Sequence, residues 1–312
     1  MWLKRFSYYV LNHPWPVVAI LFIATLVPGL GMLTMLVATF VTLCQGAKRG
    51  ALLTLAATLP CLLGMMVSVG MNAHGMADLS LTDWATAGIA IISNVLTYGF
   101  AVLLRRGRPI SSLLEIAALF GVLVVSVLHL IYPDLADWWT RILQQYYGEA
   151  KAMMGTLSGT TADRLNDLQQ ASIQDTKYYA TGLFTAAILF NAMLQLFVAR
   201  WWQAITLKPA LKQEWHQIHL APLAGILFVA AGALVYWDNV VITDIMPILY
   251  LLFGVAGLSL VHFLLSGLHR GAWFWLILVY IGLFVLLPDS LLILGLLAIA
   301  DCWFDIRKHL IR

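Results

Sequence analysis

Charged residues are scarce in this chain, and their scarcity indicates its class. Of 312 residues only 11% are Asp, Glu, Lys or Arg, whereas 62% are hydrophobic, and the mean hydropathy is +0.88. A soluble domain normally carries about 25% charged residues, so this chain has too few to cover a water-soluble globule. We therefore predict an integral membrane protein that is solvated by the lipid bilayer.

Cysteines and catalytic motifs are equally sparse. The three cysteines, Cys44, Cys61 and Cys302, lie in or beside apolar segments and form no CxxC or Cys/His pattern, which is typical of small buried side chains. The sequence has no HExxH motif, no nucleophile elbow and no phosphate-cradling glycine loop. Its net charge of +3 is not gathered in a basic patch with interleaved aromatic residues. We expect no enzyme activity, no cofactor, no metal and no nucleic-acid partner.

The few charges alternate along the chain. Every second gap between apolar runs is basic, and the remaining gaps carry acids or almost no charge. The basic gaps contain Lys4 and Arg5; Lys48 and Arg49; Arg105, Arg106 and Arg108; residues 200–212; His269 and Arg270; and the tail with Arg307, Lys308 and Arg312. Because basic loops stay in the cytoplasm, the alternation predicts a multi-pass protein with both termini cytoplasmic.

The apolar segments themselves predict an all-α, polytopic transmembrane helix bundle. After residue 50 they cover residues 51–71, 84–104, 110–132, 178–201, 221–236, 245–268, 272–287 and 291–304. An earlier run, 17–44, is broken at Pro28 and Gly29 into pieces of about eleven and fifteen residues, shorter than the roughly 20 that a straight membrane helix needs. A tight or re-entrant hairpin and a single kinked helix both fit this run. The hairpin would bring the total to about ten membrane segments.

One sizeable soluble insertion, residues 133–177, separates N-terminal membrane helices (1–132) from C-terminal ones (178–312). It falls on the side opposite to the basic gaps, so it is predicted to be extracytoplasmic. Its first half carries an apolar stripe at helical spacing, and a more polar second helix is expected over about 161–174. The stripe consists of Trp139, Leu143, Tyr146, Ala150, Met153 and Leu157. Such an amphipathic helical hairpin packs on the membrane surface, covers the bundle as a lid, or contacts a partner.

A second candidate contact surface lies in the cytoplasmic loop 207–220. Pro209 can open a short helix there, with Leu211, Trp215 and Ile218 on one side. Anchoring at the membrane interface and docking of a cytoplasmic subunit are both compatible with this pattern. The residues predicted to contact a protein partner are Trp139, Leu143, Tyr146 and Trp215.

Polar side chains inside the apolar segments are the candidates for ligand binding, because burying them in hydrocarbon is costly. The set is Asn94, Asn191, Gln195 and His262. Asn191 and Gln195 are four residues apart, so they share one helix face and could line a cavity together. Interhelical hydrogen bonds, which membrane bundles use routinely, are the structural alternative.

Titratable residues near the ends of the apolar segments form a second group. His129 and Asp134 are predicted at an outer mouth, where His74 and Asp137 would join them if the fold brings these gaps together. Glu115 is an acid near the start of an apolar segment, and with Ser112 it fits a capping box. We therefore assign Glu115 to helix capping or interfacial pairing.

Several short patches of the chain resemble the YybS-like family of bacterial multi-pass proteins of unknown function. They are residues 200–204 (RWWQA), Lys208 with Pro209, 214–216 (EWH), 133–139 (PDLADWW) and 301–307 (DCWFDIR). The resemblance implies a bacterial inner membrane and a topology similar to the substrate-binding subunits of energy-coupling-factor vitamin transporters. Those subunits dock on a scaffold through small residues of their first helix. Here Ala47 and Ala51 have that spacing but flank a basic turn, which argues against such docking.

From these patterns we predict a membrane component that binds or transports a small-molecule or lipid-like ligand. The alternative is a membrane scaffold or assembly partner that contacts other membrane or cytoplasmic proteins through the stripe and the 207–220 loop. An enzyme acting on lipid ranks third.

Overall fold

The computed structural model describes residues 2–27, 29–71, 81–154, 160–207, 211–267 and 271–310. Within these ranges the chain forms helices and turns and no strand, so the all-α prediction is confirmed. The chain divides into two compact units, which we call the first unit (Met1–Leu114 and Ile188–Ile218) and the second unit (Glu115–Ala187 and His219–Arg312). The predicted boundaries at residues 132 and 177 both fall inside the second unit.

Several helices have the length and apolarity of membrane spans, and the protein is a multi-pass membrane protein. Among the described residues, four helices meet both conditions, and a fifth span results if the bent pair α1 and α2 is counted as one. The four are residues 87–105 of α5 (Leu81–Arg105), α6 (Ile110–Ile131), α9 (Ala180–Thr206) and α12 (Val240–Ser266). The rest of the expected segments correspond to other helices, among them the shorter apolar helices Gly31–Gln45 and Pro222–Val235, and whether each of them crosses stays a prediction.

Most helix ends lie close to the predicted ones, because the polar gaps that interrupt hydrophobicity also interrupt the helices. The remaining apolar segments form α4 (Ala47–Met71), α11 (Pro222–Val235), α13 (Ala272–Val285) and α14 (Leu287–Phe304). The largest differences are at two ends: α9 continues to Thr206 instead of ending at residue 201, and α12 starts before the predicted residue 245. Helix α12 starts at Val240, because the Asn239 side chain caps it by accepting a hydrogen bond from the Ile242 amide at 3.1 Å.

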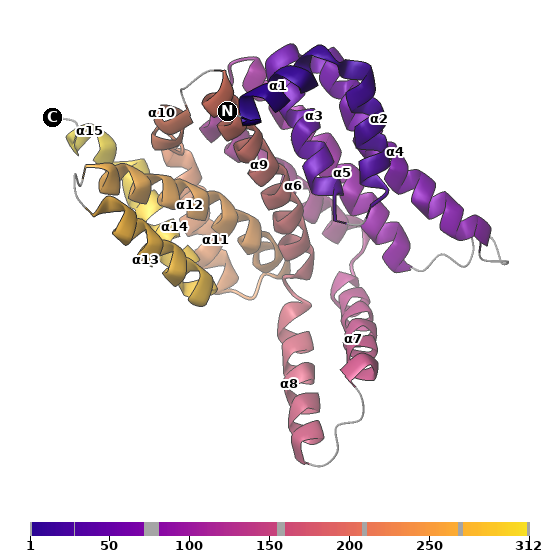
Figure 1. Cartoon of the computed structure of the whole chain (residues 1–312). Helices are drawn as coiled ribbons and strands as arrows, with labels where there is room; N and C mark the ends of the chain where they lie inside the picture. The colour runs from indigo at the N-terminus through magenta and orange to yellow at the C-terminus, as the bar shows by residue number, and fades with distance from the viewer. Residues whose placement is uncertain are drawn as a thin grey trace. The chain divides into compact units, whose positions relative to one another are not determined.

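The first apolar run folds back on itself, so the interpretation as one kinked helix is wrong. Helix α2 (Pro14–Thr25) and helix α3 (Gly31–Gln45) both pack against α4, and the Thr25 hydroxyl donates to the Thr34 hydroxyl at 3.0 Å across the turn (Figure 1). At about 1.5 Å per residue both are too short for a hydrocarbon core of about 30 Å. The pair therefore has the dimensions of a re-entrant hairpin.

Helix α1 (Trp2–Asn12) precedes this hairpin and is amphipathic. It is bent by 106° relative to α2. Its buried side contains Ser7, whose hydroxyl accepts a hydrogen bond from the Trp202 indole at 2.8 Å, and Phe6, whose ring stacks on Trp202 at 5.7 Å. Trp2, whose ring stacks on Phe6 at 5.5 Å, and Tyr8 are exposed, as expected for a helix at a membrane interface.

The second unit is built around the pair α12 and α14, with α11 and α13 beside them (Figure 1). The two central helices approach closely where small residues face backbone. A Cβ atom added at Gly257 would lie 2.0 Å from the Leu294 carbonyl oxygen. Close approach at glycine is the usual way in which membrane helices gain packing.

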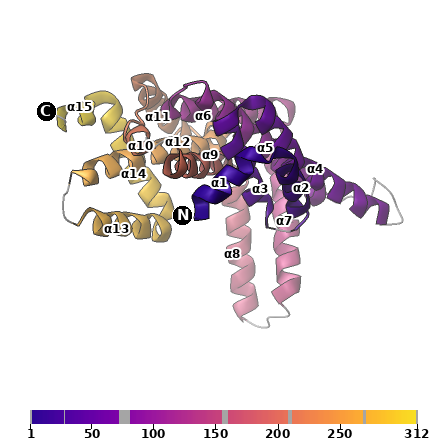
Figure 2. The ribbon, with the colours of Figure 1, turned by 45° about the horizontal axis from the view of Figure 1, so that its top comes forward.

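The insertion after α6 is a helical hairpin, as predicted. Helices α7 (Leu135–Met154) and α8 (Thr160–Thr176) lie side by side, and the Tyr147 hydroxyl is 3.2 Å from the Ser172 hydroxyl (Figures 1 and 2). Of the apolar stripe, Leu157 and the side chains of Ala150 and Met153 lie outside the described residues. The extracytoplasmic position of this hairpin stays a prediction from the charge pattern.

Candidate functional site

Two of the four predicted ligand-binding residues form hydrogen bonds between helices of the first unit. The Asn94 amide of α5 donates to the Thr58 hydroxyl of α4 at 3.1 Å, and the Asn191 amide of α9 donates to the Ser93 hydroxyl of α5 at 2.6 Å. Asn94 is buried and Asn191 is half-buried. These contacts are interhelical hydrogen bonds, the alternative to ligand binding that the sequence also allowed for these side chains.

The other two candidates differ from this pair. Gln195, one turn after Asn191, is 5% exposed, and its Oε1 atom has no hydrogen-bond partner among the described residues. His262 belongs to the second unit, where its Nδ1 is 2.8 Å from the Leu258 carbonyl and its Nε2 is 3.3 Å from the Tyr280 hydroxyl. Gln195 therefore keeps an acceptor for water or a ligand, whereas both His262 ring nitrogens have protein partners.

A cavity of about 700 Å³ lies elsewhere in the first unit, where the ends of several helices meet. We call it the basic cavity, because it is lined by three arginines and one carboxylate. Its walls comprise Leu11, Leu43, Cys44, Gln45, Leu104, Arg105, Gly107, Arg108, Pro109, Ile110, Ser111, Arg200, Gln203, Leu207, Glu214 and Gln217. None of the four polar candidates is among these residues.

One wall of the basic cavity is held by Arg200 of α9. Its guanidinium binds the Glu214 carboxylate through two nitrogen atoms, with Nε 2.9 Å from Oε2, and also donates to the Gln203 side chain. Glu214 belongs to the short helix α10 (Leu211–His216). The neighbouring Trp215 packs edge-on against Phe197, with the ring centroids 5.2 Å apart. Arg200 is thus largely committed to joining α10 to α9.

The opposite wall carries Arg105 and Arg108. Arg105 ends α5 and donates from Nη1 to the Leu43 carbonyl at 2.9 Å, which satisfies a carbonyl in the last turn of α3. Gly46, which follows α3 and lies beside this guanidinium, has a φ of +105°, a backbone conformation that L side chains rarely adopt. Arg108 is exposed. A guanidinium has five N–H donors, so this wall keeps donors for an anion.

In the sequence, the arginines of the basic cavity indicate only the topology. Their basic gaps are far apart in the chain, and nothing local shows that they line one cavity. A usable signal was that Gln203 lies three residues after Arg200, which places a second polar side chain on the same helix face.

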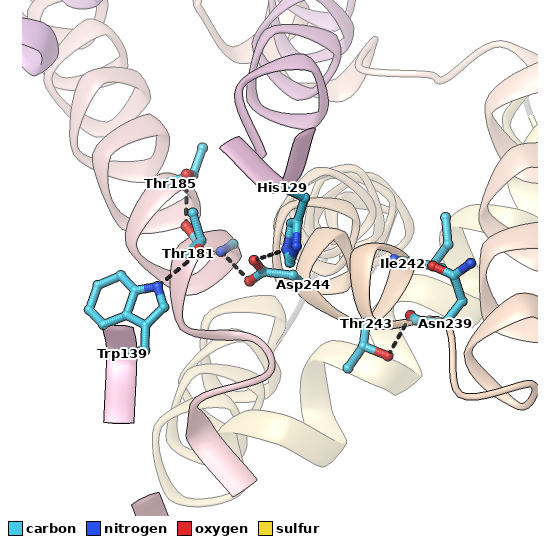
Figure 3. Close-up of polar contacts among 9 residues, drawn as sticks. His129, Trp139, Thr181, Thr185, Asn239, Ile242, Thr243 and Asp244 are labelled. Atoms are coloured by element: carbon cyan, nitrogen blue, oxygen red, sulfur yellow. Dashed lines mark hydrogen bonds and ion pairs between the residues drawn. The ribbon is translucent and has the colours of Figure 1, made fainter. Parts of the chain in front are cut away.

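At the predicted outer mouth, His129 pairs with a residue that the sequence analysis did not select. His129 Nε2 lies 2.9 Å from Asp244 Oδ2, and Asp244 Oδ1 accepts a hydrogen bond from the Gly182 backbone amide at 2.6 Å (Figure 3). Gly182 is in the first turn of α9, so Asp244 caps that helix from α12. Asp244 is 2% exposed. It was assigned to a polar gap, because the start of α12 was placed five residues late.

We call His129, Asp244 and Gly182 the Asp244 clasp. Gly182 has to be glycine, because an added Cβ would lie 1.5 Å from the Asp244 backbone oxygen. Asp134, the other predicted member of the mouth, is exposed, and its backbone carbonyl accepts from the Asp137 and Trp138 amides at the start of α7. His74 lies outside the described residues.

The predicted partner-contact residues fall into two groups. Trp139 is buried against Leu135 and Ala180, and its indole donates to the Thr181 hydroxyl at 2.7 Å (Figure 3). Its main contacts are therefore internal. Leu143 and Trp215 are half-buried, whereas Tyr146 is 67% exposed.

The end of the second unit that carries the basic tail has a polar cluster of its own. Arg307 Nε donates to Asp301 Oδ2 at 2.9 Å, and the His219 Nε2 atom is 3.1 Å from the Asp301 carbonyl. The Glu115 carboxylate accepts from the Ala221 amide at 3.0 Å. The capping box predicted for Glu115 is wrong, because α6 starts at Ile110, two residues before the proposed cap.

Comparisons with protein-family models, with curated proteins and with solved structures find no match for this chain. Within the described residues, no group of three or more His, Cys, Asp and Glu side chains is arranged to hold a metal ion. The basic cavity and the Asp244 clasp are therefore the two arrangements from which function has to be inferred.

Proposed function

We propose that this multi-pass membrane protein binds a small-molecule or lipid-like ligand in the basic cavity. The observation that carries the proposal is a cavity of about 700 Å³ whose wall mixes charged, amide and apolar side chains. Ligand sites in proteins usually measure about 300 to 1,000 Å³ and combine an apolar lining with a few polar groups. The proposal moves the expected site from mid-membrane side chains to the ends of the helices.

The position of the cavity favours a ligand that reaches it from the basic face of the membrane. Arg105, Arg108 and Arg200 belong to gaps that the charge pattern assigns to the cytoplasm. A bacterial inner membrane and membership of the YybS-like family remain proposals that rest on the resemblance of short patches. Transport would require a further conformational step, and ligand binding is the part that the cavity supports.

The test is to purify the full chain in mild detergent and identify bound small molecules by native mass spectrometry. We expect one ligand per chain in the wild type. The variant Ser111→Trp fills the cavity and should lose that ligand, whereas Leu123→Trp, at an exposed apolar position of α6, should retain it. Wild-type protein without any ligand, or equal retention by both variants, would overturn the proposal.

A scaffold function is the second candidate, and the surface of the α7 and α8 hairpin favours it. Tyr146 of α7 and Leu168 of α8 are each 67% exposed, although their hairpin is not one of the candidate membrane spans. A contact surface would form if these two side chains belong to one contiguous apolar patch of the hairpin. Affinity purification of the tagged full chain should then recover a stoichiometric partner that Tyr146→Ser with Leu168→Ser releases. Recovery of the same partner by this double variant would count against the hairpin as the contact surface.

A further inference from the structure

We propose that the ligand of the basic cavity carries a phosphate group, which binds at the wall formed by Arg105, Arg108 and the start of α6. This inference rests on the proposed function, because it names the chemical class of the ligand for the same cavity. The shared chemistry is a phosphate monoester or diester on an organic body. A lipid headgroup and a soluble phosphate ester are its two sources.

Charge balance points to an anion. The cavity wall contains three guanidinium groups and one carboxylate, and that carboxylate, Glu214, is already paired with Arg200. Among the described residues of the wall, the positive charge of Arg105 and Arg108 therefore has no carboxylate counterpart. A nearby anion would be stabilised by both groups, more strongly than in open water because the cavity wall lowers the local dielectric constant.

The hydrogen-bond donors favour phosphate among anions. Arg105 is held in place by its bond to the Leu43 carbonyl, and its guanidinium has further N–H groups. Ile110 and Ser111 line the same wall and begin α6, whose first backbone bond runs from the Leu113 amide to the Pro109 carbonyl at 3.2 Å. The amides before Leu113 thus precede the helical ladder. Guanidinium groups combined with amides at a helix start are a usual environment for phosphate oxygens.

The apolar part of the wall indicates that the phosphate is attached to a larger body. The cavity is several times larger than one water molecule, which occupies about 30 Å³ of liquid. Leu11 of α1, Leu104 of α5 and Leu207 just after α9 supply apolar lining. An inorganic ion would leave these side chains without contacts, whereas the glycerol and first methylene groups of a lipid, or the carbon skeleton of a soluble ester, would cover them.

The test compares two neighbouring arginines. Arg108 lines the cavity and Arg106 does not, although both are exposed and both follow α5. The full chain is purified in dodecyl maltoside, a detergent without phosphate, and titrated with glycerol 3-phosphate by calorimetry. In a second arm, dioctanoyl phosphatidylglycerol is titrated into detergent-solubilised protein. We expect saturable binding of at least one probe, weakened about tenfold by Arg108→Gln, because one charge-assisted contact is lost, and nearly unchanged in Arg106→Gln.

The two titrations distinguish a soluble phosphate ester from a lipid headgroup, and the arginine variants test whether the phosphate binds at the proposed wall. Binding of glycerol 3-phosphate indicates a soluble ester, and binding of phosphatidylglycerol alone indicates a lipid headgroup. Equal weakening of probe binding by both arginine variants would reveal nonspecific attraction and overturn the inference. The inference would also be overturned if neither probe binds. If the co-purified ligand is lost in Ser111→Trp and its mass shows that it contains no phosphate, the proposed function stands and the phosphate class is wrong. If Ser111→Trp also retains it, both fail.

Discussion

The basic cavity and the Asp244 clasp both place charged side chains at the ends of apolar helices, yet they use them in opposite ways. In the clasp, each carboxylate oxygen of Asp244 meets one partner, and the side chain is buried. In the cavity, Arg105 and Arg108 share the described wall with one carboxylate, Glu214, which is paired with Arg200. Charge that is matched and enclosed joins helices, whereas charge that is left unmatched around a cavity is available to a ligand.

The largest effect is expected from closing the space at Gly182 in the clasp. Gly182→Ala would place a Cβ atom 1.5 Å from the Asp244 backbone oxygen, so α9 and α12 would have to separate. We expect a loss of about 3 kcal/mol in the free energy of unfolding, measured by thermal or SDS titration in detergent. Gly232→Ala is the control, since its added Cβ meets nothing within 4 Å. A similar loss in both variants would contradict the close contact.

Removing the carboxylate of the clasp should have the next largest effect. Asp244→Ala leaves the Gly182 amide and the His129 ring without their acceptor, and we expect a loss of about 2 kcal/mol in unfolding free energy. Asp175→Ala, at an exposed position of α8, is the matched control and should change stability by less than about 0.5 kcal/mol. Ligand binding in the basic cavity should survive in Asp244→Ala protein that remains folded. If Asp244→Ala is as stable as the wild type, the hydrogen bonds of the clasp do not contribute to the free energy of unfolding.

A substitution in the wall of the basic cavity should change ligand binding more than it changes the stability of the protein. Glu214→Gln removes the one carboxylate of the wall and frees Arg200. We expect phosphate-bearing probes to bind about threefold more tightly, with a stability loss of about 1 kcal/mol at most, because partly exposed ion pairs contribute little. The measurement is the same calorimetric titration with the protein's thermal midpoint recorded in parallel. Weaker binding in this variant would mean that Glu214 itself contacts the ligand.

The smallest effect concerns pH at the exposed end of the second unit. A hydrogen bond from the Lys308 ammonium lowers the pKa of the Asp305 carboxyl below its ordinary value of 3.8. Its contribution to stability is therefore present above that value and disappears as the pH falls through the lower folded-state pKa. We expect a slightly smaller acid-induced fall of the thermal midpoint in Asp305→Asn than in the wild type. An identical pH profile for both proteins would show that the contact has no energetic role.

The helices were predictable because their signals are local. The segment predicted at 110–132 is α6 to within one residue, and the 221–236 segment differs from α11 by one residue at each end. The error at α12 has an equally local cause. An asparagine cap at Asn239 opens the helix before its apolar run begins, so the acid at 244 lies inside the helix and faces its neighbours.

The sequence alone determined that this is an all-α membrane protein, because hydrophobic length and charge spacing are properties of consecutive residues. It also marked Asn94 and Asn191 as polar groups within apolar helices. Their partners, and those of His129 and Arg105, were decided only by the tertiary structure, because each hydrogen bond joins segments from 36 to 115 residues apart. The same holds for the basic cavity. Its charges are visible in the sequence, but folding determines which of them are neutralised and which remain for a ligand.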